Sequence, residues 1–308
     1  WANGTRPGST ASSIENKLVT WEKNGNLNTG IEASMFGGRL TSTIEYYSRR
    51  TRDMLLNNPL AISSGFSGYD DNVGSMVNRG LETSFRGVIF DRSNFHWDAS
   101  LMLSMNRNKV TELTSSQDVI NYGSVVIEKG KPIYTFYMSK SAGVSPSTGR
   151  QLYYAYYRYA VDKTGSIVTE KCDEYVTDNV GLASLSKYYY GSRQALFSGS
   201  FSSNFTFFKN FDFSFLTTFS VGGKIYDSLY GGAMNVTYAG NNWHKNVLRR
   251  WQQPGDITDV PLVEIGGSRS STGEELIDAS YFAIKNITLG YTLPSSLTKK
   301  AGIGACRV

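Results

Sequence analysis

The chain has 308 residues, 40% of them hydrophobic and 13% aromatic, and its 31 Lys and Arg against 26 Asp and Glu give a net charge of +5. No run approaches the about 18 consecutive apolar residues that a membrane-spanning helix needs, so a helical membrane protein is excluded. The cations are scattered rather than gathered in a basic block, which argues against a nucleic-acid partner. The abundance of Tyr, Phe and Gly favours strands and turns.

The first part of the chain predicts a loop followed by two β-hairpins. Residues 1–20 are rich in Gly, Ser, Thr and Asn, which is typical of a loop. Between Leu27 and Tyr47, apolar and polar side chains alternate on both sides of Gly37-Gly38, a two-residue turn signal. After a long loop, strands are predicted over Leu81–Ile89 and Phe95–Met105, joined by a short polar turn.

The clearest alternation runs from Gln194 to Gly222. Phenylalanines at odd positions alternate with Ser, Asn and Thr at even positions, on both sides of a tight turn at Phe208–Asn210. With a period of two, one face of this hairpin is aromatic and the other carries small polar groups. Each strand has about 11 residues, enough to cross a bilayer at the tilt of a barrel. A soluble sheet packed on a core also alternates, but the uncharged polar face here favours a barrel lumen.

The connections between strands alternate in length. A second long loop covers Gly223–Ser280, and the last complete strand is Tyr281–Tyr291, whose alternation slips near Asn286, as a β-bulge would cause. A turn begins at Pro294, and 302–308 begins a further strand. Short turns and long loops therefore alternate along seven complete strands and one partial strand, which is typical of an outer-membrane barrel with short periplasmic turns and long extracellular loops.

The long segment from Lys109 to Ser192 is constrained by the strands on either side. These strands run in opposite directions, so the segment between them holds an even number of membrane crossings. The apolar stretch Ile133–Met138 could suggest one strand, but a single crossing would break this parity. We therefore predict that Ile133–Met138 lies in the extracellular excursion and does not span the membrane.

Four stretches match a known family. They are Trp21-Glu22-Lys23 with Thr51–Leu55, Asn72–Glu82 with Trp97 and Asn106–Val110, Arg249–Pro261, and Asp278–Pro294. In these stretches the chain resembles, over its full length, the C-terminal part of the barrel of SusC/RagA-like TonB-dependent transporters from the Bacteroidetes outer membrane. It departs from the family at Phe282-Ala283, where the family more usually has a leucine–arginine pair.

The resemblance implies an all-β, antiparallel transmembrane barrel of about 22 strands with a plugged lumen. It implies import of oligosaccharides or oligopeptides across the bacterial outer membrane, energy from the TonB complex, contact with outer-membrane lipid and a SusD-like surface lipoprotein as a lid. The family's N-terminal extension, TonB box, plug and last barrel strands are not found in this sequence. We therefore expect residues 1–308 to be an arc of about eight strands, the C-terminal part of such a barrel.

Two other interpretations stay open. The same barrel could belong to a non-transporting structural or adhesin-like outer-membrane protein. A secreted β-sandwich that binds glycans is a more distant alternative. A TonB box and a plug preceding these residues would distinguish transport from the first alternative, and solubility without detergent would favour the second.

The sequence carries no constellation typical of catalysis. His96 and His244 are the only histidines, which excludes a His-rich metal site, and no nucleophile has a suitable base beside it. His96 lies on the polar face of its strand, and we predict that it lines the lumen. Cys172 and Cys306 have no metal or redox spacing. No enzyme activity, cofactor or metal is therefore expected.

Aromatic residues of the long loops are the candidates for substrate binding. Tyrosine has a flat apolar face and a hydrogen-bonding tip, which suits stacking on sugar rings or gripping a peptide. The same residues could instead pack the loops together, anchor the barrel in the membrane interface or contact the lipoprotein, and for the two tryptophans lid docking or loop packing is favoured. The candidate substrate-binding residues are Tyr153, Tyr154, Tyr156, Tyr157, Tyr188, Tyr189, Trp243 and Trp251.

Overall fold

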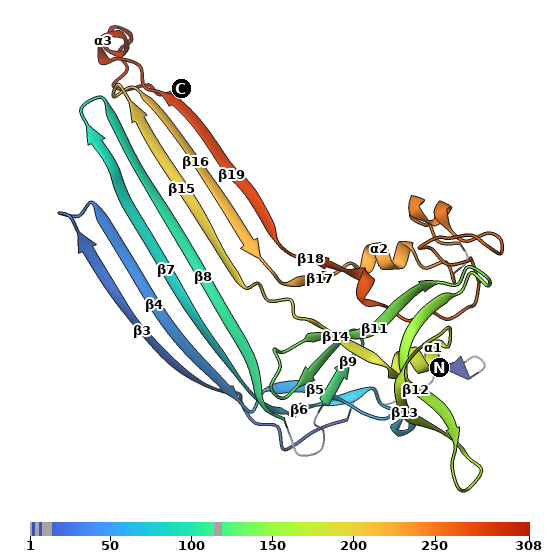
Figure 1. The fold of residues 1–308 in the computed structure, drawn as a ribbon. Coiled ribbons are helices and arrows are strands. Elements are labelled where there is room, and N and C mark those ends of the chain that lie inside the picture. Colours follow the sequence, from blue (N-terminus) through green and yellow to red (C-terminus); the bar gives the residue numbers. More distant parts are fainter. Residues whose placement is uncertain (1, 4–5, 8–13, 114–118, 239) are drawn as a thin grey trace.

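A seven-stranded antiparallel sheet dominates the computed structural model, which describes residues 2–3, 6–7, 14–113, 119–238 and 240–308 (Figure 1). Its strand order is β19-β16-β15-β8-β7-β4-β3, so strands that follow one another along the sheet also follow one another along the chain. Each of the seven predicted strands is present. They are β3 (Lys23–Met35), β4 (Leu40–Arg52), β7 (Gly74–Arg92), β8 (Phe95–Leu113), β15 (Phe197–Phe207), β16 (Phe211–Val221) and β19 (Tyr281–Tyr291).

The short turns lie together at one end of this sheet. The turn between β15 and β16 is Phe208–Asn210, as predicted, and Phe208 and Lys209 adopt left-handed backbone angles without glycine. The turn between β3 and β4 covers 36–39, which is longer than the predicted two residues. The reason is local: Phe36 also has a positive φ of 55°, and Arg39 N donates to its carbonyl at 3.4 Å.

Registers place the phenylalanines of β15 and β16 on one face. The two strands pair without a shift from Phe197↔Val221 to Phe207↔Phe211. The Trp97 ring of β8 stacks on Phe205, with 5.4 Å between centroids, and its indole Nε1 donates to Ser203 Oγ at 2.8 Å. Cross-strand aromatic pairs of this kind stabilise a sheet.

The predicted bulge in β19 is confirmed. Leu216 of β16 pairs with Asn286, but the next residue, Thr217, pairs with Ile284, so Lys285 is the extra residue. Because the shift changes the parity of the strand, both Ile284 and Ile287 face the aromatic side.

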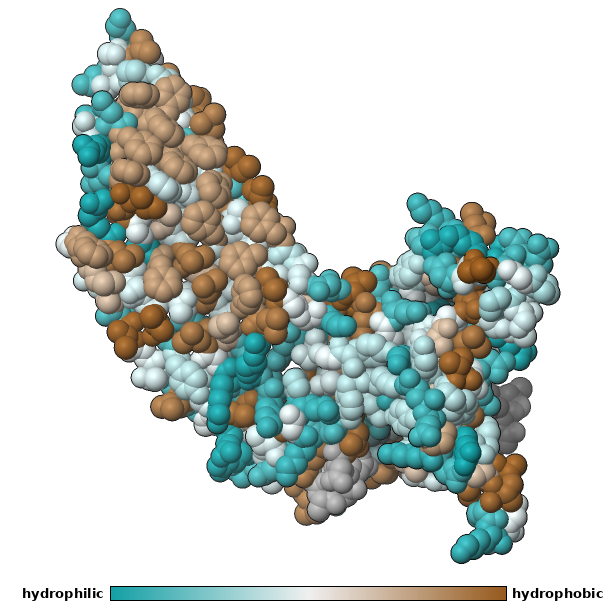
Figure 2. All heavy atoms as spheres, viewed as in Figure 1, coloured by the Kyte–Doolittle hydropathy of each residue, from teal (hydrophilic) through white to brown (hydrophobic). Residues whose placement is uncertain are grey.

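The aromatic face of the sheet is exposed. Figure 2 shows it as a nearly continuous hydrophobic surface, and side chains such as Ile31 and Leu289 are 71% and 73% exposed. Along β7 the apolar outward positions extend from Leu81 to Phe90, about 30 Å of strand. At a barrel's tilt this corresponds to a height of ~23 Å, close to the apolar band of an outer-membrane barrel.

The buried apolar clusters lie at the other end, in the long connections. One cluster contains Val73, Val110, Ile120 and Ile127; a second contains Met234, Val236, Val247 and Val260; a third contains Val125, Phe136 and Met138. These residues belong to the extracellular segments or to the loop ends of the strands. Buried apolar cores of the kind found in water-soluble proteins therefore lie at the loop end of the molecule.

The first long excursion forms a sheet of its own. Its order is β13-β12-β11-β10-β9, and β14 pairs with β11. The stretch Ile133–Met138 enters β11 and lies outside the seven-stranded sheet, as predicted. The strands are β9 (Val119–Tyr122), β10 (Val125–Glu128), β11 (Thr135–Val144), β12 (Gln151–Val161), β13 (Ile167–Thr177) and β14 (Lys187–Gly191).

Short elements complete the fold. The paired strands are β1 (Ala2–Asn3) with β2 (Arg6–Pro7), β5 (Leu55–Pro59) with β6 (Gly68–Asn72), and β17 (Lys224–Tyr226) with β18 (Leu276–Asp278). The helices are η1 (Ile62–Ser64), α1 (Val180–Leu185), α2 (Ser228–Ala233), η2 (Lys245–Arg249), η3 (Gly273–Glu275), α3 (Ser295–Thr298) and η4 (Lys299–Ala301). Among the described residues, no helix is both long and apolar enough to cross a membrane.

The segment after α3 and η4 returns to the edge of the sheet. Tyr291 and Val308 exchange two backbone hydrogen bonds, of 2.8 and 3.0 Å, and Leu293 N donates to Cys306 O at 2.9 Å. The partial strand expected over 302–308 therefore begins to pair with β19. Cys172 and Cys306 are both free thiols.

Candidate functional site

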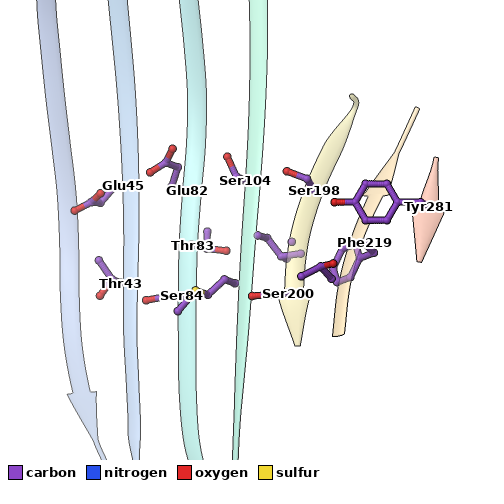
Figure 3. Close-up of a pocket in the computed structure, with 14 residues that line it drawn as sticks. Thr43, Glu45, Glu82, Thr83, Ser84, Ser104, Ser198, Ser200, Phe219 and Tyr281 are labelled. Carbon is purple, nitrogen blue, oxygen red and sulfur yellow. The ribbon is translucent and has the colours of Figure 1, made fainter. Parts of the chain in front are cut away.

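The polar face of the seven-stranded sheet forms a shallow groove of about 510 Å³ (Figure 3). One row of directly paired residues crosses it, from Glu45 through Glu82 and Ser104 to Ser198. Most of the labelled side chains are short or acidic and come from neighbouring strands, and the rings of Phe219 and Tyr281 lie at one end of the group. Because strand residues alternate between faces, this hydroxyl- and carboxylate-bearing wall lies directly behind the aromatic face.

His96 also lies on this polar face. Its Nδ1 is 3.2 Å from Asp91 Oδ1, and its Nε2 is 3.6 Å from Asp98 Oδ2. Its position on the polar side of β8 is the one the sequence predicts, and both ring nitrogens face carboxylates. Among the described residues, no group of three His, Cys, Asp or Glu side chains is placed to hold a metal ion.

The two tyrosine clusters of the first excursion come together. Tyr188 of β14 packs edge-on against Tyr156 of β12, with 5.5 Å between ring centroids. Tyr137 of β11 lies 4.7 Å from Tyr189 and places its hydroxyl 3.4 Å from that of Tyr156. Tyr157 continues the group at 5.2 Å from Tyr156. Tyr154 joins this group through Lys140, which lies over the rings of both Tyr154 and Tyr188. The tyrosine patch is therefore Tyr137, Tyr154, Tyr156, Tyr157, Tyr188 and Tyr189.

Charged groups lie among these rings. Lys140 Nζ is 4.2 Å from the centre of the Tyr154 ring and 3.4 Å from Glu174 Oε2. The Tyr188 hydroxyl donates to the same carboxylate oxygen at 2.7 Å. Lys131 lies over Tyr189, at 3.7 Å from the ring centre, and Tyr189 donates to Glu128. Cation–π contacts and charge-assisted hydrogen bonds therefore fix the ring orientations.

The protonation states follow from burial and from these bonds. Desolvation by burial, followed by the hydrogen bond to Glu174, raises the pKa of Tyr188. Burial, followed by the contact with Tyr137, raises the pKa of Tyr156. The hydrogen bond from Tyr188 is the main cause that lowers the pKa of Glu174. Near neutral pH the patch therefore presents neutral hydroxyls beside an ionised carboxylate.

The other candidates lie elsewhere. Tyr153 is 1% exposed, because its side chain points to the side of β12 opposite Tyr154, and its hydroxyl accepts a hydrogen bond from Ser270 N at 3.2 Å. Trp251 packs on the turn between β11 and β12: its Nε1 donates to Pro146 O at 3.0 Å, and its ring leaves room only for glycine at position 149. Trp243 lies at the surface, 37% exposed.

Buried contacts join the two excursions. Within the second excursion, Glu275, 6% exposed, pairs with Arg269 at 2.9 Å and accepts a hydrogen bond from Tyr226 at 2.7 Å, which orders the segment next to Ser270. Ser139 of β11 lies 2.7 Å from Ser270, hydroxyl to hydroxyl. The wall of the patch and the second excursion therefore form one packed unit.

The sequence analysis missed several members of the site. Tyr137, Lys140 and Glu174 were not candidates, because the patch depends on the pairing of β11 with both β12 and β14. A signal was present for Tyr137, since it lies within the apolar stretch Ile133–Met138 that parity places outside the membrane.

No family model matches the chain. TonB-dependent receptor P39 of Formosa agariphila is 29% identical to it, over 93% of this chain and 31% of the receptor. TonB-dependent receptor P3 of the same organism is 26% identical, over 98% and 30%. TonB-dependent receptor SusC of Bacteroides thetaiotaomicron is 27% identical, over 90% and 26%. These proteins are named as receptors, not as enzymes.

Solved structures give the same result. The RagAB peptide transporter superposes with a TM-score of 0.76 at 28% identity, covering 97% of this chain and 32% of that chain. The RagAB peptide importer in its "open-open" state gives 0.70 at 26% identity, over 96% and 31%. The chain thus spans about a third of the length of these relatives. Sequence and fold together make it a relative of the SusC- and RagA-like TonB-dependent receptors, which are outer-membrane proteins.

Proposed function

We propose that this chain supplies barrel wall and extracellular loops to an outer-membrane importer of a bulky nutrient, an oligosaccharide or an oligopeptide, driven through TonB. One observation carries the proposal: a sheet with an apolar outer face and a polar inner face has all its long connections at one end. The inner face lines the route, and the loops meet the nutrient first. The similarity to the RagAB peptide transporter supports the oligopeptide class, and the oligosaccharide class follows from the family resemblance of the sequence.

The tyrosine patch is the proposed nutrient-binding surface. Its exposed and half-buried rings can stack on a sugar or on a peptide side chain. The hydroxyls of Tyr188 and Tyr189 already donate to carboxylates, so their oxygens can accept hydrogen bonds from the nutrient. Tyr189 is 47% exposed, whereas Tyr153 is buried and would support the patch from below. Residues 1–308 would be the C-terminal part of the receptor barrel, with the plug supplied by preceding residues.

A SusD-like lipoprotein is the proposed lid. The second excursion exposes large apolar side chains, namely Leu229 at 86%, Leu248 at 74% and Ile257 at 94%. Contiguous exposed apolar patches mark protein contacts, and we propose that these side chains contribute to one. We assign Trp243, on the same excursion, to this lid contact, and Trp251 to loop packing.

The test uses the whole receptor with its lid protein. Tyr154→Ala combined with Tyr188→Ala should weaken nutrient binding roughly 30-fold, since interfacial aromatic anchors contribute ~2 kcal/mol. Titration calorimetry with oligopeptide and oligosaccharide pools would measure the change. Tyr159→Ala is the matched control, because Tyr159 lies on β12 outside the patch and is 54% exposed.

The outcomes separate the hypotheses. Wild-type affinity in the double variant would remove the patch from the binding site. Absence of uptake of either pool by cells that carry the intact receptor would favour the structural or adhesin-like alternative.

A further inference from the structure

A row of cations crosses the outward face of the sheet just beyond the apolar band. Arg107 of β8 is paired directly with Arg79 of β7, and Arg79 with Ser48 of β4. One row nearer the loops, Lys109 and Arg50 flank Val77. Lys23 of β3 and Arg52 of β4 form a further cationic pair at the loop end. We call these six residues the basic belt: Lys23, Arg50, Arg52, Arg79, Arg107 and Lys109.

These side chains point away from the lumen. In β8 the exposed Arg107 and Lys109 alternate with the buried Asn108 and Val110. In β4 the exposed Arg50 and Arg52 flank the buried Thr51. With a period of two, the cations therefore continue the face that carries Leu81 and Met105 below them.

Few carboxylates neutralise the belt. Asp53 pairs with Lys23 at 2.8 Å, and Glu112, one row nearer the loops, lies 3.5 Å from the Ser75 hydroxyl. Within the described part of the chain, the four arginines of the belt and Lys109 make no ion pair. Like charges placed directly opposite each other destabilise a sheet. Arg107 donates only to the backbone carbonyls of Asn106 and Leu196, at 3.4 and 3.3 Å, so the positive charges of the Arg79–Arg107 pair are left for an anion from outside the chain to neutralise.

The turn end of the same outward face carries different side chains. There the outward positions carry paired aromatic rings: Phe90 stacks on Trp97 at 5.9 Å, and Phe211 lies tilted against Tyr291 at 4.5 Å. Aromatic rings suit a headgroup region without a particular charge. Cations also occur at the turn end, such as Arg92 opposite Phe95 and Lys209 in the β15–β16 turn, but only the loop end gathers them in adjacent rows of neighbouring strands. A dense cationic row on one side matches a membrane whose outer leaflet is the more anionic one.

We propose that the basic belt binds the phosphate groups of a phosphorylated lipid headgroup in the outer leaflet of the membrane. The acyl chains would lie on the apolar face around Leu81 and Met105, and the phosphates would sit between the guanidinium groups of Arg79 and Arg107. Arginine suits this task, because its planar fork donates two parallel hydrogen bonds to one phosphate. The belt crosses four strands, a width of ~14 Å, which fits a single large headgroup.

The test places the whole receptor in phosphatidylcholine nanodiscs that contain diphosphoryl lipid A, and mass spectrometry counts the lipid A retained after purification. Arg79→Gln with Arg107→Gln should lower retention roughly 30-fold, the factor that ~2 kcal/mol corresponds to for two cations near a lipid surface. Arg49→Gln is the matched control: Arg49 precedes Arg50, faces the lumen and donates to Asn26. It should leave retention unchanged.

Two further measurements test the proposal even if the glutamine variant fails to assemble. Arg79→Lys with Arg107→Lys keeps both charges and should retain most of the lipid, and high salt should release lipid A from the wild type. Equal retention of phosphorylated and dephosphorylated lipid A would overturn the proposal. Full displacement of lipid A by inorganic phosphate at the same concentration would also overturn it, because the site would then bind free anions.

Discussion

In the extracellular β-structure, apolar side chains are buried as in a water-soluble protein, whereas on the seven-stranded sheet they are exposed. Phe136 of β11 is fully buried, but Phe282 of β19 is 69% exposed. Both regions are built from alternating strands, so alternation alone does not tell where the apolar side goes. The solvent of each region decides it: water around the loops selects buried apolar groups, and lipid around the sheet selects exposed ones.

The largest loss of stability is expected in the extracellular core. Phe136→Ala should cost ~3–5 kcal/mol of local stability, because it leaves a cavity in a close-packed site. Hydrogen exchange and limited proteolysis should show opening of β10, β11 and β14. Heat-dependent gel mobility, which reports barrel closure, should stay at the wild-type value, and a lost barrel would mean that the two regions fold as one unit.

On the seven-stranded sheet, the informative change replaces an exposed apolar side chain with a charged one. Phe215→Arg should cost ~2–4 kcal/mol, because Phe215 lies midway along the apolar face of β16 and a cation there faces hydrocarbon. Urea unfolding of the whole receptor in lipid bilayers would measure the loss.

The neighbouring position supplies the control. Ser214→Arg lies on the polar side of the same strand and should leave the unfolding free energy nearly unchanged. If both arginine variants were equally stable, the assignment of the two faces would be wrong.

The smallest predicted effect concerns a hydrogen bond on the apolar face. Trp97→Phe keeps an aromatic ring against Phe205 but removes the donor to Ser203, a residue that is 1% exposed. The loss should be ~1 kcal/mol, the usual contribution of one hydrogen bond. Trp97→Phe combined with Ser203→Ala should recover part of it, since no acceptor is then left unpaired, and an additive loss would contradict this explanation.

The seven-stranded sheet and the extracellular sheet also differ in how well they can be predicted from the sequence. The seven strands and the bulge near Asn286 were predictable, because long alternation on both sides of short turns is a local signal. The extracellular sheet was not: β9 and β10 have four residues each, and β14 pairs with β11 some 50 positions earlier. Short strands whose partners are distant leave no pattern that a single sequence displays.

The candidate site was likewise predictable only where the signal is local. Tyr153 and Tyr154 are adjacent, so they face opposite sides of β12, and only one of them joins the patch. This could have been inferred from the period of two. The contribution of Lys140 and Glu174 could not, because their contact depends on the order of strands β11, β12 and β13.

The extra residue in β19 sets the phase of that strand. Its two halves are out of step by one position, and Lys285 absorbs the difference. If Lys285 were paired as an ordinary strand residue, the half nearest the loops would invert: Phe282 and Ile284 would turn to the lumen, and Ala283 would turn to the lipid. Deleting Lys285 would instead remove the bulge and leave Phe282 and Ile284 opposite Phe219 and Thr217 on the lipid side. A single inserted residue therefore lets two segments of opposite parity serve one membrane-facing surface.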